Sequence, residues 1–517
     1  MGRSRLWRVI ALVMVMAMVA LACGSSADDA VEATDQGGDA AEVADETEES
    51  DTEEGDGDGS GPDGSAGVDG PQAGTDDQVS LITGNGWGVD DNNVLVGPSG
   101  YTVDLASCPD DWSDTGGITD DEIRLGQSIA QSGTVAVYGT WTDGMRNYFD
   151  YINETEGGVD GKALSLIDKD DAYDAVRAVS NVDQLLETEN IFAITSQLGT
   201  PMNLATYDTI NEACVPHLFP GSGHPAWADP EFHPWTVSSA VWLGYNTEGT
   251  LWGEYIDTQF DEPVTVAALV LNNDAGVAWE QGFKDYAEAN PDVIAGYESE
   301  RYEADAPTIT NEMTTLGATG AEAFILMGGS IYCPQAMDAI AEAAWDPPVK
   351  IVPTVCSGIQ SFFVPAGQNG NGWALLNNGK DLTDARWDGD EFVELARENL
   401  TSGGIDITTG LYGQAYENAW PIVEALKVAA ELPGGLTRTN FMLSLRSMNR
   451  EHPMKLPGIS FALDGNADGY TIEGGQFVKY SVEQDQEAGT FAPVGDIFDV
   501  NGTTPNCTFG EAPENQC

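Results

Sequence analysis

A short acidic segment near the C-terminal end of the chain carries the clearest metal-ligand pattern in the sequence. Asp464, Asn466 and Asp468 alternate and are followed by Gly469, which is how a calcium-binding loop begins. Such a loop ends on a glutamate at its twelfth position, where both carboxylate oxygens bind the ion. This chain has Gly475 at that position. We therefore expect a β-turn here rather than a calcium site.

Other residues that could support catalysis or metal binding lack the spacing that this chemistry needs. The sequence has no G-x-S-x-G nucleophile turn, no H-E-x-x-H zinc helix and no phosphate-binding G-x-x-x-x-G-K-[ST] loop. The histidines do not have the spacing of zinc ligands; they are His217, His224, His233 and His452. We expect a protein that is not an enzyme and that uses no metal or cofactor.

The N-terminus has the pattern of an export signal. Arg3, Arg5 and Arg8 precede an uncharged apolar run from Val9 to Ala22, which is too short to span a membrane comfortably. Small residues before Cys23 resemble the cleavage box of bacterial lipoproteins, so residues 1–22 are a predicted signal peptide and Cys23 a predicted lipidation site. An ordinary secretory peptide and an uncleaved anchor are the alternatives. We expect an extracytoplasmic protein tied to the cell membrane.

Residues 23–80 are rich in Asp, Glu, Gly, Ser and Ala and contain few large apolar residues. Such a segment buries too little surface to offset its ordering entropy, so we expect a disordered acidic tether. An N-terminal extension, 81–117, follows it. The whole chain has a formal net charge of −65, which excludes a general role in nucleic-acid binding because phosphates require a positive field.

From residue 118 onward, strand and helix patterns alternate. Alternation of this kind predicts an α/β fold with parallel sheets covered on both faces. Expected strands lie at 122–129, 163–167, 191–194, 215–219, 265–271, 322–327 and 350–354, with a strand pair at 460–463 and 476–481. Expected helices lie at 135–154, 175–189, 202–212, 242–257, 279–289, 334–344 and 412–431. The pattern restarts after residue 238, which indicates two similar lobes with a ligand cleft between them.

The order and spacing of several motifs resemble a known family. They include Ile123-Arg124-Leu125-Gly126, Gly157-Gly158-Val159, Pro220-Gly221-Ser222-Gly223 and Trp279-Glu280-Gln281-Gly282-Phe283. These are similar to the type I periplasmic binding proteins, and most of all to the leucine/isoleucine/valine and amide receptors of ABC importers. The resemblance implies two Rossmann-like lobes joined by three crossings. Lobe one would be 118–238 with 372–455, lobe two 239–371 with 456–485, and 486–517 a C-terminal tail.

The resemblance also implies ligand-binding residues. Thr200 falls where the family holds the ligand carboxylate at a helix N-terminus, which suits an anion. Ser222 and Gly223 lie on the loop after the fourth strand, which supplies backbone donors in the family. Trp279 replaces an aromatic residue that closes over the ligand. Tyr138 and Tyr332 lie near two further positions where the family presents aromatic residues.

One departure from the family bears on the ligand. Amino-acid receptors of this group usually place an acidic residue after the strand at 350–354 to pair with the ligand ammonium, whereas this chain has Val355 and Cys356. A buried ammonium without a carboxylate is strongly disfavoured. The ligand is therefore not expected to be a standard branched-chain amino acid; a carboxylate, an amide or an aromatic compound stays open.

The cysteines indicate disulfides, because six remain besides Cys23 and an exported protein meets an oxidising compartment. Within the resemblance, Cys333 and Cys356 each lie just past a lobe-two strand and could pair. That pairing would leave two further pairs, Cys108–Cys214 and Cys507–Cys517.

Two functions fit these features. The first is a monomeric, lipid-anchored solute receptor that closes on a small polar solute (an amino acid, amide or carboxylate-bearing compound) and delivers it to ABC permease subunits with their ATPases. The second is a sensory ligand-binding protein on the same scaffold that signals to a membrane receptor. Fold alone does not separate them.

Overall fold

The computed structural model of the protein describes residues 66–68 and 70–507. The predicted signal peptide, Cys23 and most of the predicted tether lie outside these residues. Among the described residues, no helix combines the length and apolar composition needed to cross a membrane.

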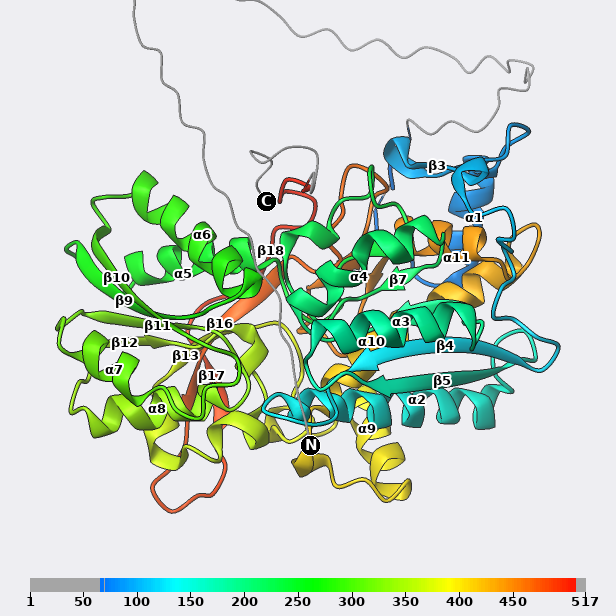
Figure 1. Cartoon of the computed structure of the whole chain (residues 1–517). Helices are drawn as coiled ribbons and strands as arrows, with labels where there is room; N and C mark the ends of the chain where they lie inside the picture. Colours follow the sequence, from blue (N-terminus) through cyan, green and yellow to red (C-terminus); the bar gives the residue numbers. More distant parts are fainter. Residues whose placement is uncertain (1–65, 69, 508–517) are drawn as a thin grey trace, which may run out of the picture. The chain divides into compact units, whose positions relative to one another are not determined.

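Lobe one is built on a five-stranded parallel sheet with the strand order β5-β4-β6-β7-β8 (Figure 1). Its strands are β4 (Glu122–Ile129), β5 (Ala163–Asp170), β6 (Ala193–Thr195), β7 (His217–Leu218) and β8 (Thr236–Val237). Its helices are α2 (Trp141–Glu156), α3 (Ala175–Glu187), α4 (Thr200–Glu212), α9 (Glu391–Ser402), α10 (Tyr412–Glu431) and α11 (Arg438–Arg446). Local sequence signals set several boundaries: α2 ends at Gly157 in the left-handed conformation, and the Asp174 side chain caps α3.

Lobe two contains the larger sheet, with the order β10-β9-β11-β12-β13-β16-β17 and β18 paired to β16. The strands are β9 (Val264–Leu271), β10 (Ile294–Tyr302), β11 (Ala323–Met327), β12 (Val349–Ile351), β13 (Ala374–Asn377), β16 (Gly474–Ser481), β17 (Thr490–Pro493) and β18 (Phe498–Asp499). Its helices are α5 (Tyr245–Asp257), α6 (Asp274–Ala289), α7 (Thr310–Gly317) and α8 (Tyr332–Glu342). Pairing is parallel from β10 to β13 and antiparallel beyond it. The expected α/β fold with two parallel-sheet lobes is confirmed.

Short helical turns occur in the connecting segments. They are η1 (Pro98–Gly100), η2 (Leu105–Ser107), η3 (Ala136–Thr140), η4 (Pro225–Trp227), η5 (Thr354–Cys356), η6 (Ile359–Phe363), η7 (Gly367–Gly370), η8 (Ala385–Trp387) and η9 (Ile407–Thr409). Two of them bear on the cleft. η3 carries Tyr138 directly after β4, and η5 carries Val355 after β12.

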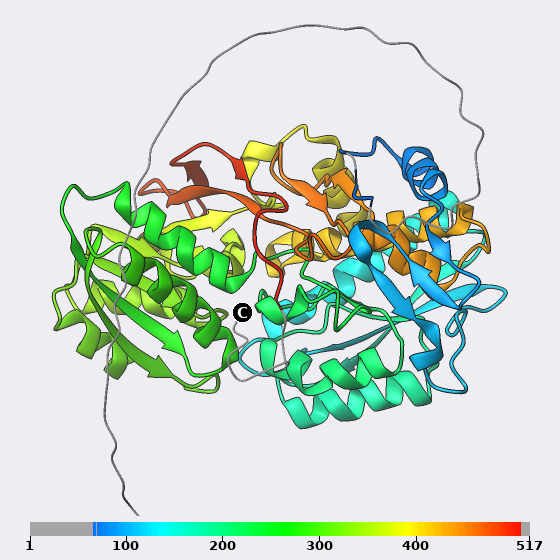
Figure 2. The same cartoon turned by 90° about the horizontal axis from the view of Figure 1, so that it is seen from above.

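The N-terminal extension packs on lobe one (Figure 2). It contains α1 (Thr75–Gly84) and an antiparallel sheet of β1 (Gly88–Val89), β2 (Val94–Val96) and β3 (Thr102–Asp104). The predicted tether, 23–80, is wrong at its end, because residues 75–80 belong to α1. Gln78 and Ile82 of this helix are buried, and the Gln78 side chain donates to the carbonyl oxygen of Ser444. The Val-Ser-Leu-Ile run gives the helix an apolar face that the acidic composition upstream obscures.

The C-terminal part of the chain differs from the sequence prediction in its pairing. Strand β15 (Ser460–Ala462) pairs with β14 (Asn449–Glu451), not with β16, which joins β13 and β17 in lobe two. The lobe-two sheet also continues through β13, past the boundary predicted at residue 371. Residues 490–499 are not part of a free tail, since β17 and β18 extend that sheet. Strand pairing between distant segments decides these points, and local patterns do not reveal it.

The acidic segment at 464–469 forms a tight turn, in which the Ala467 N–H donates to the Asp464 carbonyl. The Asp464 carboxylate accepts from the Ser99 hydroxyl at 2.8 Å and from the Val68 N–H at 3.1 Å. Its side chain therefore holds the N-terminal extension in place. Across residues 66–68 and 70–507, no group of three or more His, Cys, Asp or Glu side chains is arranged to hold a metal ion.

Two of the three disulfide pairs are confirmed. Cys108–Cys214 joins the N-terminal extension to the end of α4, and Cys333–Cys356 joins α8 to η5 within lobe two. The third predicted pair involves Cys517, which lies outside the described residues.

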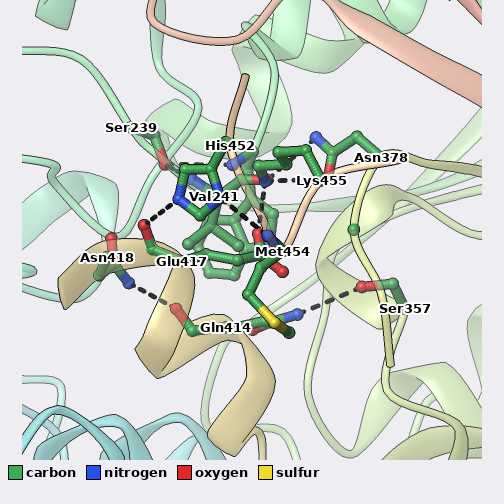
Figure 3. Close-up of polar contacts among 12 residues, drawn as sticks. Ser239, Val241, Ser357, Asn378, Gln414, Glu417, Asn418, His452, Met454 and Lys455 are labelled. Atoms are coloured by element: carbon green, nitrogen blue, oxygen red, sulfur yellow. Dashed lines mark hydrogen bonds and ion pairs between the residues drawn. The ribbon is translucent and has the colours of Figure 1, made fainter. Parts of the chain in front are cut away.

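Three connections join the lobes, and buried polar contacts tie them together (Figure 3). They comprise residues 238–244, 378–390 and 463–473. The Lys455 ammonium pairs with the Glu417 carboxylate of α10 and donates at 3.2 Å to the Val241 carbonyl and to Asn378 Oδ1. Ser238 and Ser239 of the first connection accept hydrogen bonds from Thr471 of the third.

Candidate functional site

A cavity of about 60 Å³ lies between the two lobes. Lobe one contributes residues after β4, β5, β6 and β7, and lobe two contributes residues at or after the ends of β9, β10, β11 and β12. These are the carboxyl ends of parallel strands, where open α/β sheets bind their ligands. Its lining is Val135, Tyr138, Tyr173, Leu198, Gly199, Thr200, Gly221, Trp242, Tyr245, Leu271, Ala275, Trp279, Tyr302, Ala304, Gly329, Ser330, Tyr332 and Val355.

The structure brings four of the predicted binding residues to this cavity: Tyr138, Thr200, Trp279 and Tyr332. Ser222 and Gly223 lie just behind the wall and do not line it. The Ser222 hydroxyl is 2.7 Å from that of Thr200, and the Gly223 carbonyl accepts from the Tyr245 N–H at 2.6 Å. These two residues thus support lining residues, because their loop turns away from the cavity toward the first connection.

Thr200 is the first residue of α4, and its side chain is buried. Gly199 precedes it with a φ of 93°, and a Cβ there would lie 2.1 Å from the Met202 side chain, so the position requires glycine. The Ser222 hydroxyl accepts from the His224 N–H at 3.1 Å, which fixes its position beside Thr200. The positive end of the α4 dipole therefore faces the cavity with an oriented hydroxyl.

Trp279 forms part of the lobe-two wall and is held from two sides. Its ring stacks on Tyr245 with the ring centres 3.7 Å apart, and its indole N–H donates to Glu248 Oε2 at 2.8 Å. Glu248 Oε1 accepts from the Thr354 N–H at 2.6 Å. Burial outweighs these donors and raises the pKa of Glu248 to about 7. Glu248 positions Trp279 and does not itself line the cavity.

Tyr138 joins the lobes across the cleft. Its hydroxyl donates to the Val355 carbonyl at 3.0 Å and accepts from the Ser330 N–H at 3.2 Å. The Ser330 hydroxyl donates in turn to the Thr134 carbonyl of lobe one. The two lobes are therefore in direct contact around the cavity, and burial raises the pKa of Tyr138 above its ordinary value.

Sequence reasoning missed several lining aromatics, namely Tyr173, Trp242, Tyr245 and Tyr302. Trp242 was expected to begin a helix, but α5 begins at Tyr245 and leaves Trp242 in the first connection. Tyr302 ends β10, a strand whose mixed polar sequence conceals it. Tyr302 shares its face of the strand with Glu298 and Glu300, so the alternation along β10 gives no signal for a buried position.

Gly328 and Gly329 follow β11 and leave space for two tyrosine hydroxyls. A Cβ on Gly328 would lie 1.7 Å from the Tyr302 oxygen, and one on Gly329 would lie 3.0 Å from the Tyr138 oxygen. Any larger residue at 328 would displace Tyr302 from the wall. This close approach explains why two glycines occur at the end of a buried strand.

The comparisons with known proteins agree with this architecture. A family model described as periplasmic binding protein matches residues 122–472, which is more than half of the chain. A sequence search among curated proteins finds no match.

Solved structures with the same fold carry different ligands or ligand names. A branched-chain amino acid ABC transporter protein from Thermus thermophilus, with bound valine, is 16% identical at a TM-score of 0.64, covering 74% of this chain and 97% of its own. A fatty acid ABC transporter substrate-binding protein from Thermomonospora curvata is 18% identical at 0.62, covering 76% and 96%. A solute-binding protein from R. palustris, in complex with 4-hydroxybenzoate, is 15% identical at 0.59, covering 73% and 97%.

These identities show a shared fold and leave the ligand of this chain open. The resemblance noted in the sequence is confirmed by the family match over both lobes, together with the two-lobed fold and a cavity at the strand ends. The chain therefore belongs to the periplasmic binding protein family, in the type I group that contains the branched-chain amino acid receptors.

Proposed function

We propose that this protein is an extracytoplasmic solute receptor of an ABC importer, anchored by a lipid on Cys23, which captures a small solute between its lobes and delivers it to the permease. One observation carries the proposal: the cavity is bounded by both lobes, and Tyr138 and Ser330 bond across it. A solute inside contacts both lobes at once only when they are together. Its binding therefore stabilises the closed form by its differential affinity.

The similar structures support transport over sensing as the output, since several are described as ABC transporter proteins. Their printed ligands, valine and 4-hydroxybenzoate, both bear a carboxylate. A carboxylate is also the group that suits the N-terminus of α4 with the Thr200 hydroxyl. The solute class consistent with these points is an amino acid, an amide or a carboxylate-bearing compound.

Binding is tested by thermal unfolding of the purified full chain with amino acids, amides, short carboxylates and aromatic acids. A ligand specific for the folded state raises the melting temperature by mass action. Thr200→Ala is expected to weaken the responding solute by roughly tenfold, since it removes a hydrogen bond to a charged group. Thr209→Ala, on the exposed side of the same helix, is the matched control. Equal binding by both variants would exclude this cavity, and no response to any solute would count against a receptor.

The anchor is tested separately in cells. Cys23→Ser is expected to move the protein from the membrane fraction to the soluble extracytoplasmic fraction, because only the lipid would hold it there. A variant that stays in the membrane fraction would show that residues 1–22 act as an uncleaved anchor instead.

A further inference from the structure

The ligand class can be narrowed from the charges around the cavity, on the assumption that the proposed receptor function is right. No Asp, Glu, Lys, Arg or His is among the described residues that line it. Glu248, which holds the lining residue Trp279 from behind, is 1% exposed, and both of its oxygens already accept hydrogen bonds from Trp279 and Thr354. A ligand ammonium would therefore find no carboxylate among the described lining residues to pair with.

The cavity wall contains two polar hydrogens that have no acceptor within the described chain. They belong to the indole N–H of Trp242, which is 4% exposed, and to the hydroxyl of Tyr302, which is 3% exposed. A buried donor without an acceptor costs free energy, and an indole N–H can only donate. Both residues line the same cavity as Thr200, although these two polar atoms are themselves covered by neighbouring groups. A ligand oxygen that reached either atom would supply the missing acceptor, so the wall favours a ligand rich in acceptor oxygens.

The remainder of the wall is apolar. Val135, Leu198, Leu271 and Val355 supply aliphatic surface, and the stacked rings of Tyr245 and Trp279 supply a flat aromatic surface. Such surfaces favour a hydrocarbon chain or ring in the body of the ligand. The cavity is also small, so the ligand is a compact one.

We propose that the solute is a small monocarboxylate with an apolar body and no amino group, whose oxygens accept hydrogen bonds from Thr200, Trp242 and Tyr302. The distinctive element is the absence of the ammonium, because amino acids present the same carboxylate. Trp242 and Tyr302 are the residues that set this preference for acceptors, in addition to the hydroxyl at the start of α4.

Matched ligands test the class by calorimetry on the purified full chain. 4-Methylpentanoate and leucine differ only in the α-amino group, as do 3-phenylpropanoate and phenylalanine. We expect the deaminated acid of at least one pair to bind, and its amino acid to bind about 100-fold more weakly or worse, because burying an unpaired ammonium is costly. The matching carboxamide is expected to bind more weakly than the acid, since its NH₂ would face the donors of the wall.

Three results would overturn the monocarboxylate proposal: an amino acid that binds as tightly as its deaminated partner, a carboxamide that binds better than the acid, or no binding by either acid. The first two would leave the receptor function intact, since a solute would still bind. The third would leave the receptor function to be decided by the wider solute panel described above.

Two variants test the residues. Tyr302→Phe removes the hydroxyl and keeps the ring, and is expected to weaken the acid by about tenfold. Tyr255→Phe removes a second buried hydroxyl that also lacks a partner in the described chain, but its ring stacks on Phe477 away from the cavity. It should leave binding unchanged. Equal effects from the two variants would show that Tyr302 acts through stability alone and not as a donor to the ligand.

Discussion

The cavity and the connections between the lobes differ in where they carry charge. The described lining of the cavity has no charged side chain, whereas the connections surround a buried ion pair between Glu417 and Lys455. Both regions are deeply buried and both contact the two lobes. The difference teaches that charge is placed where its partner is part of the chain, and is absent from the described lining of the cavity that we propose binds the solute.

The ion pair can be tolerated because the buried ammonium of Lys455 is fully bonded. The Lys455 ammonium has three acceptors: Glu417, Val241 and Asn378 (Figure 3). His452 stays neutral beside it, because burial lowers its pKa; its Nδ1 accepts from the Met454 N–H and its Nε2 donates to the Glu417 carbonyl.

The cavity follows the opposite rule. If a charged side chain lined the cavity, it would be unpaired whenever the proposed solute left. The cost of burying that unpaired charge would then oppose closure of the lobes. Neutral donors such as Trp242 and Tyr302 impose a smaller penalty when unpaired. Neutral donors therefore oppose contact between the lobes less than a charge would, and the lobes meet in the Tyr138–Val355 hydrogen bond.

Breaking the ion pair should give the largest effect. Lys455→Met keeps the shape of the side chain but leaves the Glu417 carboxylate buried without a cation, and we expect a loss of about 3–5 kcal/mol in the free energy of unfolding. Urea unfolding followed by tryptophan fluorescence measures it. Lys427→Met, which removes a partly exposed lysine paired with Glu156 and Glu424, should cost no more than about 1 kcal/mol.

The double variant sharpens this test. Adding Glu417→Gln to Lys455→Met removes the unpaired charge and should restore part of the lost stability, because the desolvation penalty disappears with it. If the single variant is no less stable than Lys427→Met, the buried pair does not hold the connections together as described.

The sequence predicts the neutral cavity better than the charged connections. Thr200 and Trp279 follow from the resemblance to the family, and α10 was predicted with its observed bounds because these depend on local periodicity. Lys455, Asn378 and Val241 are far apart in the chain, and no local pattern relates them. The same reason explains the missed β10 and the wrong partner of β15, both of which depend on which distant segments pair.

Glu248 is equally hidden, because its role depends on Thr354 and Trp279 reaching it from other elements. An acidic residue on an otherwise buried helix face beside Tyr245, Gly249 and Trp252 was the available signal.

The smallest expected effect concerns Glu248. It tests whether the region behind the cavity wall is uncharged like the wall itself. The pKa of Glu248 is raised to about 7 in the folded protein, from an ordinary value of 4.5. Between these two pH values the Glu248 carboxyl is ionised in the unfolded chain and still protonated in the folded chain. The free energy of unfolding therefore falls as pH rises from one value to the other. We expect the free energy of unfolding to decrease by about 3 kcal/mol more in the natural chain than in Glu248→Gln between pH 4.5 and pH 8.

The natural chain and Glu248→Gln are compared at each pH, so that the contribution of the many surface carboxylates to the pH dependence cancels. Trp279→Phe serves as the second variant: it removes a donor that favours the ionised form, and should therefore raise the pKa of Glu248 further and move the window to higher pH. A difference between the natural chain and Glu248→Gln that does not change with pH would mean that Glu248 is ionised throughout. A fixed negative charge would then lie directly behind Trp279, and the contrast between a neutral site and charged connections would not hold.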